Sequence, residues 1–194
     1  AKGATAYISL EPCSFTGKTG ACTNALQTAG IVRVVSAMED PNPKVSGQGN
    51  ALLRAAGLDV SNGLMAEQAA VLNRGFIKRM QKQLPFVSCK MAMSLDGRSA
   101  MASGESQWIT APPARQQVQQ LRASSCAIVT GVGTVIHDDP SLNVREQNLG
   151  APVERQPALV IVDSQLKTPL SAKVLSAAML ATRDVYIACL NTAP

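Results

Sequence analysis

The chain has 194 residues and a net charge of +5, and its 46% hydrophobic and 16% charged residues are typical of a globular protein with a sizeable core. Aromatic residues make up only 3% of the sequence and the basic residues are scattered, which argues against a nucleic-acid-binding surface. No apolar run approaches the roughly 18 residues of a membrane span, and five cysteines without a signal-peptide pattern predict a reducing, cytoplasmic environment.

The first predicted element is a strand over residues 6–10, which leads to a pair of cysteines. Pro12 suits the first turn of a helix, so the pattern predicts that a helix starts at Pro12 and Cys13. Free N–H groups at that helix start would favour a thiolate at Cys13, the form that binds zinc. Cys22 follows a glycine-containing loop, so both thiols could hold one ion. Ordinary buried thiols explain the pattern equally well.

Strands and helices alternate through the rest of the first half. The pattern predicts helices over residues 23–29, 50–56 and 66–80, and strands over residues 31–35 and 58–60. A new pattern starts after residue 83, so we place a domain boundary near Gln83. The alternation predicts a layered α/β domain.

The second half repeats the α/β pattern. We predict strands over residues 86–93, 126–130, 158–162 and 184–190, and a helix capped by Thr110 that runs to about residue 122. Gly131 and Gly133 open a further short helix together with Thr134. Their backbone N–H groups suit a pyrophosphate, although a pair of turn glycines explains the pattern as well.

Several motifs resemble one enzyme family when they are taken in order. In the first half they are Leu10-Glu11-Pro12-Cys13-Ser14, Cys22 and Asp40-Pro41-Asn42-Pro43; in the second half they are Lys90-x-Ala92-x-Ser94-Leu95-Asp96-Gly97-Arg98, Ser103-Gly104-Glu105-Ser106-Gln107-Trp108-Ile109-Thr110 and Thr134-x-x-x-Asp138-Asp139-Pro140-x-Leu142-x-Val144-Arg145. Their order and spacing resemble the bifunctional deaminase/reductases of riboflavin biosynthesis. The resemblance implies an α/β fold with part of a cytidine-deaminase-like domain over residues 1–83 and part of a dihydrofolate-reductase-like domain over residues 84–194.

For the first domain, the resemblance implies zinc-dependent hydrolytic deamination of a phosphorylated diamino-ribosylaminopyrimidinone. Cys13 and Cys22 would be two of the Zn²⁺ ligands. In the family, the third ligand and the proton shuttle come from a His-Ala-Glu segment that would precede residue 1, so no catalytic residue of this step is present in the sequence. We therefore expect the chain as written to lack deaminase turnover. Glu11 matches a backbone motif of the family and not the shuttle, and His137 belongs to the reductase motif.

For the second domain, the resemblance implies NADPH-dependent reduction of the ribosyl group to ribityl. The residues that would face the cofactor are Ala92, Trp108, Thr134, Asp138 and Ser164. Those that would face the substrate are Ser106, Arg122, Leu142 and Arg145. Chemistry supports the two arginines, because a guanidinium binds phosphate with two parallel hydrogen bonds. Solvated arginines and a tryptophan packed in the core are the alternatives.

Other functions stay open at this point. A stand-alone nucleobase or nucleoside deaminase, or a truncated product without catalysis, would also fit parts of the sequence. We expect a phosphorylated aminopyrimidine as the small-molecule partner, no nucleic acid, no membrane and a homo-oligomer. The chain starts without Met and within a pattern, so we expect it to be an internal part of a longer protein.

Overall fold

The computed structural model describes residues 1–106 and 108–192, apart from the side chain of residue 148. The chain forms two compact units, Ala1–Lys90 and Met91–Pro194. Each unit has a three-stranded sheet with all of its strands parallel. The predicted α/β class is confirmed, and the structure shows in addition that both sheets are parallel. Within the described residues, no helix is both long and apolar enough to cross a membrane.

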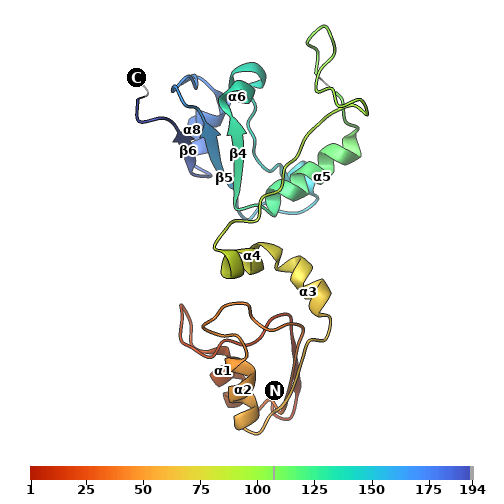
Figure 1. Cartoon of the computed structure of the whole chain (residues 1–194), viewed down its shortest axis with the longest axis vertical. Helices are drawn as coiled ribbons and strands as arrows, with labels where there is room; N and C mark the ends of the chain where they lie inside the picture. Colours follow the sequence, from red (N-terminus) through yellow and green to blue (C-terminus); the bar gives the residue numbers. More distant parts are fainter. Residues whose placement is uncertain (107, 193–194) are drawn as a thin grey trace. The chain divides into compact units, whose positions relative to one another are not determined.

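The first unit alternates strands and helices around its sheet (Figure 1). Its elements are β1 (Thr5–Ile8), α1 (Cys22–Thr28), β2 (Arg33–Ser36), α2 (Gln48–Ala55), β3 (Asp59–Asn62), α3 (Ala66–Leu72) and α4 (Arg74–Lys82). The strand order is β1-β2-β3, and α1 packs beside α2. Ile31, Val34 and Leu53 form the buried core. Apolar residues at the centre of the sheet and on the inner face of α2 thus hold this unit together.

The second unit begins with a helix and then builds its own sheet. Its elements are α5 (Pro112–Ala123), β4 (Ala127–Gly131), α6 (Val132–Asp138), α7 (Glu146–Leu149), β5 (Ala158–Val162), the short 3-10 helix η1 (Lys173–Leu175), α8 (Ala177–Leu180) and β6 (Val185–Ala188). The strand order is β4-β5-β6. Leu159 and Ile161 of β5 are fully buried in a cluster with Val135 and Val174. The central strand therefore directs alternate side chains into the core.

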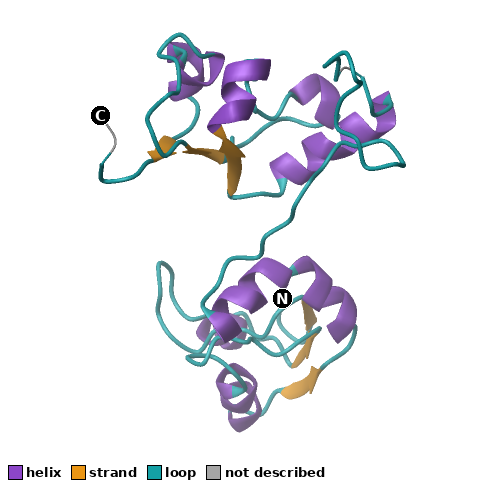
Figure 2. Cartoon of the chain, turned by 45° about the horizontal axis from the view of Figure 1, so that its top comes forward, coloured by secondary structure: helices purple, strands orange, loops and turns teal. Residues whose placement is uncertain are grey.

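Three elements predicted after residue 65 differ from the structure. The predicted helix over residues 66–80 is divided at Asn73, whose side-chain amide donates to the Ala69 carbonyl at 2.9 Å and so satisfies the end of α3. The predicted strand over residues 86–93 was wrong, because these residues pair with no strand; the described residues between α4 and α5 form only loops and turns (Figure 2). Thr110 does not cap α5, since Ala111 occupies that position.

Candidate functional site

The buried carboxylate of Glu11 joins the loop after β1 to the start of α2. Its Oε2 accepts hydrogen bonds from the backbone N–H groups of Asp40 (3.2 Å) and Gly47 (2.9 Å), and its Oε1 accepts one from Asn50 (3.0 Å). Gly47 and Asn50 lie at the N-terminus of α2, which has no capping bond from the side chain of its own N-cap residue. Glu11 therefore caps a helix that begins far away in the sequence. This carboxylate is committed to three backbone donors.

Pro12 and Cys13, the two residues after Glu11, also lie close to α2. A Cβ atom at Gly49 would overlap the carbonyl oxygen of Pro12, so only glycine lets α2 approach the Pro12–Cys13 backbone this closely. Burial raises the pKa of the neighbouring Asp40 carboxyl above its ordinary value, and the charge of Glu11 adds to this rise. The backbone around Cys13 is thus held rigidly against α2.

Cys13 in turn caps α1. The Cys22 N–H donates to the Cys13 sulfur at 3.3 Å, and the Thr23 N–H donates to the Cys13 carbonyl oxygen at 3.2 Å. The prediction of a helix start at Pro12–Cys13 was wrong, because α1 begins only at Cys22. The intervening loop brings Cys13 to this helix start. The N–H groups of Cys22 and Thr23 there are the nearby donors that the prediction required.

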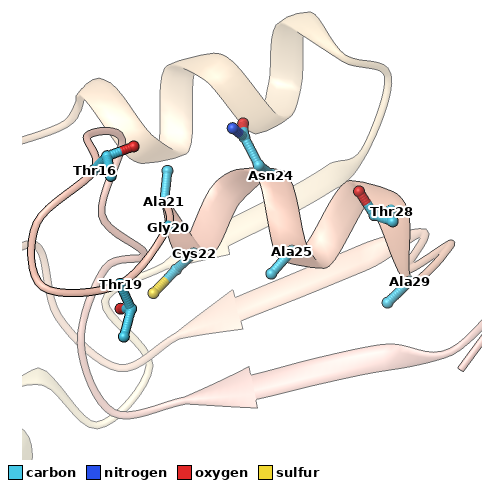
Figure 3. Close-up of a pocket in the computed structure, with 9 residues that line it drawn as sticks. All are labelled: Thr16, Thr19, Gly20, Ala21, Cys22, Asn24, Ala25, Thr28 and Ala29. Atoms are coloured by element: carbon cyan, nitrogen blue, oxygen red, sulfur yellow. The ribbon is translucent and has the colours of Figure 1, made fainter.

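The two cysteine side chains are close enough to interact. A hydrogen bond with the Cys13 side chain raises the pKa of the Cys22 thiol, and partial burial and the charge of Cys13 act in the same direction. Both cysteines are free thiols. Cys22 lies in an open pocket, between Thr19 on the preceding loop and Ala25 and Ala29 along α1 (Figure 3). Two sulfur donors side by side next to an open pocket suit a thiophilic metal.

Two thiols are too few ligands to form a zinc site by themselves. Among the residues that the structure describes, no group of three or more His, Cys, Asp or Glu side chains is placed to hold a metal ion. The nearby carboxylate of Glu11 already accepts three backbone N–H groups. Cys13 and Cys22 therefore fit two of the four positions that zinc requires.

In the second unit, arginines gather around the segment that follows α6. Arg122, near the end of α5, donates from Nη1 to the Asn143 carbonyl oxygen at 3.1 Å. The Arg145 N–H donates to the Oε1 atom of the buried Gln119 at 3.2 Å. Arg183, which precedes β6, donates to the carbonyl oxygens of residues 141 and 142. Residues 141–145 are thus held from α5 on one side and from the start of β6 on the other.

This arginine cluster carries excess positive charge. Burial lowers the pKa of Arg122 below its ordinary value, and the charges of Arg145 and Arg183 lower it further. Burial also lowers the pKa of Arg183. None of the ion pairs found among the described residues includes a member of the cluster; they are Arg33–Asp59, Arg98–Asp96 and Lys173–Asp139. An anion would relieve this repulsion.

Two of the predicted cofactor residues lie at the carboxyl edge of the second sheet. Thr134 is exposed on the first turn of α6, directly after β4, and Ser164 is exposed just after β5. These strands are paired neighbours whose ends are in register, because Gly131 lies opposite Val162. Ligands of α/β proteins commonly bind at this edge of a parallel sheet. Asp138 is exposed at the other end of α6.

The remaining predicted residues lie in loops before α5. Ala92 is half-buried, Ser106 is exposed, and 71% of the Trp108 surface is exposed. The Arg115 guanidinium stacks on the Trp108 ring, 4.4 Å from its centroid. The exposure of Trp108 excludes the alternative of a tryptophan packed in the core. Gln107 of the same motif lies outside the described residues.

The structure therefore forms two groups from the predicted residues of the second unit. Arg122, Leu142 and Arg145 come together near the amino ends of the strands, and Thr134 and Ser164 lie at the carboxyl ends. The five-residue strand β4 spans about 16 Å, so the two groups lie at opposite ends of the sheet. Sequence reasoning missed Arg183 and Gln119, which hold the first group, because their partners lie 26 to 42 residues away in the chain.

Comparison with known proteins relates the chain to one family. The family model described as RibD C-terminal domain matches residues 85–187. The riboflavin biosynthesis protein RibD of Escherichia coli is 53% identical over 173 residues, which cover 85% of this chain and 47% of that protein. RibD of Aquifex aeolicus is 46% identical over 176 residues, which cover 91% of this chain and 48% of that protein. The chain thus spans about half the length of these relatives.

Solved structures agree with this relationship. Acinetobacter baumannii RibD, form 2, has a TM-score of 0.87 at 46% identity, covering 98% of this chain and 52% of its own. A Thermotoga maritima protein described as a diaminohydroxyphosphoribosylaminopyrimidine deaminase/5-amino-6-(5-phosphoribosylamino)uracil reductase has a TM-score of 0.83 at 34% identity, covering 96% of this chain and 51% of its own. The family match over more than half of the chain, together with these similarities, shows that the chain belongs to the RibD family.

Proposed function

We propose that this chain serves riboflavin biosynthesis and carries parts of two enzymes. Residues 84–194 would belong to a dihydrofolate-reductase-like unit that uses NADPH to reduce the ribosyl group of a phosphorylated aminopyrimidine to ribityl. Residues 1–83 would belong to a cytidine-deaminase-like unit that removes ammonia from the preceding aminopyrimidine with the help of zinc. The description of the Thermotoga maritima relative names both reactions for that protein.

The positions of Arg122 and Arg145 give the reductase proposal its main support. Arg122 and Arg145 are 23 residues apart in the sequence, yet residues 141–145 bring them near each other. The positive charge of Arg145 adds to burial in lowering the pKa of Arg122, so a bound anion would be favourable here. A phosphate monoester carries up to two negative charges, and guanidinium groups bind it through parallel hydrogen bonds. Leu142 would lie against the sugar, and Ser106 would contribute a hydroxyl group.

The cofactor would bind at the carboxyl edge of the second sheet. The exposed Thr134 and Ser164 offer hydroxyl groups at neighbouring strand ends, and Asp138 lies on the same short helix as Thr134. NADPH supplies the hydride when it is bound. The protein residues bind and orient the two ligands, with Ala92 and the exposed Trp108 ring forming further parts of the cofactor surface.

The first unit would contribute two zinc ligands. Zinc supplies a Lewis acid that activates water, and Cys13 and Cys22 would hold the ion beside the open pocket. The step also needs a free carboxyl group that moves a proton to the leaving amine, and Glu11 is not free for this role. Residues 1–194 by themselves should therefore release no ammonia from the aminopyrimidine; measurable release would contradict this part of the proposal.

A titration of the 194-residue chain with NADPH tests the reductase proposal. Trp108 is the only tryptophan, so its emission reports on one place. We expect saturable quenching of this emission, with the affinity confirmed by calorimetry. Thr134→Val should weaken NADPH binding about tenfold, the usual effect of losing one hydrogen bond to a charged group. Thr182→Val removes an exposed hydroxyl group before β6 and should bind like the wild type. Absence of saturable binding would overturn the assignment.

A further inference from the structure

Arg183 is a buried cation whose hydrogen bonds all reach across the chain. Only 7% of its surface is exposed. Its Nη1 donates to the Leu142 carbonyl oxygen at 2.7 Å, and its Nη2 donates to the Ser141 carbonyl oxygen at 2.6 Å. Its Nε is buried and has no partner among the described residues. One guanidinium therefore holds two successive carbonyl groups, a geometry for which its planar fork is suited and an ammonium group is not.

The segment that Arg183 holds is in an unusual conformation. Leu142 has a φ of 48°, in the left-handed region that residues other than glycine rarely adopt. Such a conformation persists only where the surroundings enforce it, and it is found frequently at ligand-binding sites. Arg183 donates to the Ser141 and Leu142 carbonyl groups, which flank the Leu142 α-carbon, and these bonds supply that enforcement. They set the path of the chain that leads to Asn143 and Arg145.

The same segment connects Arg183 to the other arginines. Asn143 accepts the hydrogen bond from Arg122, and Arg145 follows two residues later. Arg122 uses Nη1 in this bond, and its other N–H donors make no hydrogen bond to the described residues. The neighbouring carboxylate of Glu146 accepts a hydrogen bond from the Val153 N–H at 3.2 Å. None of the ion pairs among the described residues gives Arg122, Arg145 or Arg183 a carboxylate partner.

We propose that Arg183 is the positioning residue of an anion site, holding residues 141–145 so that Arg122 and Arg145 grip one phosphate monoester. The inference rests on the proposed function for the identity of the natural ligand, a sugar phosphate. The role itself does not require NADPH chemistry. Arg183 acts through the two carbonyl groups and through its charge, and the ligand would contact Arg122 and Arg145.

Calorimetric titration with inorganic phosphate tests this role. The samples are the 194-residue wild type, Arg183→Met, Arg183→Lys and the control Arg155→Met, which removes an exposed arginine of the same unit and thus the same net charge. Arg183→Met should weaken phosphate binding about tenfold or more, as expected when one strong charge-assisted interaction is lost. Arg183→Lys keeps the charge but cannot span both carbonyl groups, so its affinity should lie between. The control should match the wild type.

The outcomes separate this inference from the proposed function. Equal phosphate affinity in wild type and Arg183→Lys and Arg183→Met, or no phosphate binding to the wild type, would overturn the inference. If Arg183→Met does not fold, Arg183→Lys decides. Each folded sample is also titrated with NADPH: a parallel loss of both affinities would mean a merely structural residue and would overturn the role. Phosphate binding that depends on Arg183, in a chain that binds no NADPH, would support the anion site and overturn the proposed reductase.

Discussion

The Glu11 carboxylate of the first unit and the arginine cluster of the second unit are buried charges that the protein compensates to different degrees. In the first unit, the Glu11 carboxylate receives three backbone N–H groups, which use its accepting capacity and connect two segments of the chain. In the second unit, Arg122 and Arg183 each donate to backbone carbonyl groups, yet their charges stand close to that of Arg145. The first arrangement is complete by itself. In the part of the chain that the structure describes, the second has no carboxylate in an ion pair with it, which is what a binding site for an anion requires.

This comparison predicts that loss of Glu11 damages the fold. Glu11→Ala should lower the free energy of unfolding of the first unit by about 3–5 kcal/mol, because buried N–H groups lose their acceptor at the start of α2. Urea unfolding followed by circular dichroism measures the change, while the emission of Trp108 reports separately on the second unit. Glu39→Ala is the control, since this exposed carboxylate accepts a bond only from the Ser46 hydroxyl group and should change the value by less than about 1 kcal/mol. Equal effects of both variants would contradict the role of Glu11.

Loss of Arg122 should leave the stability of the fold nearly unchanged and weaken the binding of an anion. Arg122→Met removes a partly buried cation from a cluster of like charges, so the free energy of unfolding should stay within about 1 kcal/mol of the wild type or rise. Phosphate affinity should fall about tenfold. Unfolding followed by the emission of Trp108 measures the first quantity, and calorimetry measures the second. A large loss of stability with unchanged phosphate affinity would show that Arg122 stabilises the fold and does not bind the anion.

The smallest expected effect concerns a charge in the second unit that resembles Glu11. The buried Asp163 accepts hydrogen bonds at 2.7 Å from both the N–H and the hydroxyl group of Thr168. Burial acts to raise its pKa, but hydrogen bonds from Lys167, Thr168 and Gln165 outweigh burial and lower the pKa below its ordinary value. The folded state therefore binds this proton less readily than the unfolded state. Its stabilising contribution is complete above the ordinary pKa of an aspartate and is lost as the pH falls through the lowered value.

Asp163→Asn should accordingly flatten the loss of stability in acid. The free energy of unfolding is measured at successive pH values from neutral to about 3, a range that covers the titration of carboxyl groups. Asp184→Asn, an exposed carboxylate of the same unit, is the matched control. An acid profile of Asp163→Asn identical to that of the wild type would show that this carboxylate contributes no pH-dependent stability.

Local patterns in the sequence were enough to predict much of the fold. The alternation of short apolar runs with glycine-ended helices predicted the α/β class and the strands that became β2 and β5. The extended residues 86–93 did not become a strand, because a strand also needs a partner and apolar character cannot show whether one is present. Residues 66–80 form two helices because a side-chain bond from Asn73 ends the first.

The candidate sites were predictable only in part. Cys13 and Cys22 could be paired from their residue type and the loop between them, and the structure brings them into contact. Glu11 fixes the segment before Cys13 through backbone N–H donors that lie 29 to 39 residues away in the sequence. The same holds for Arg183, whose partners are 41 and 42 residues distant and are backbone atoms that any residue would supply. Such contacts leave no local pattern in the sequence.

The arginines of the second unit are proposed to bind a sugar phosphate. The most direct measurement is arginine modification of the wild-type chain by phenylglyoxal, resolved by peptide mass, with and without ribose 5-phosphate and with ribose as the neutral control. We expect that ribose 5-phosphate protects Arg122 and Arg145, that ribose does not, and that the exposed Arg155 is modified equally in all samples. Equal modification of Arg122 and Arg145 with and without ribose 5-phosphate would contradict it.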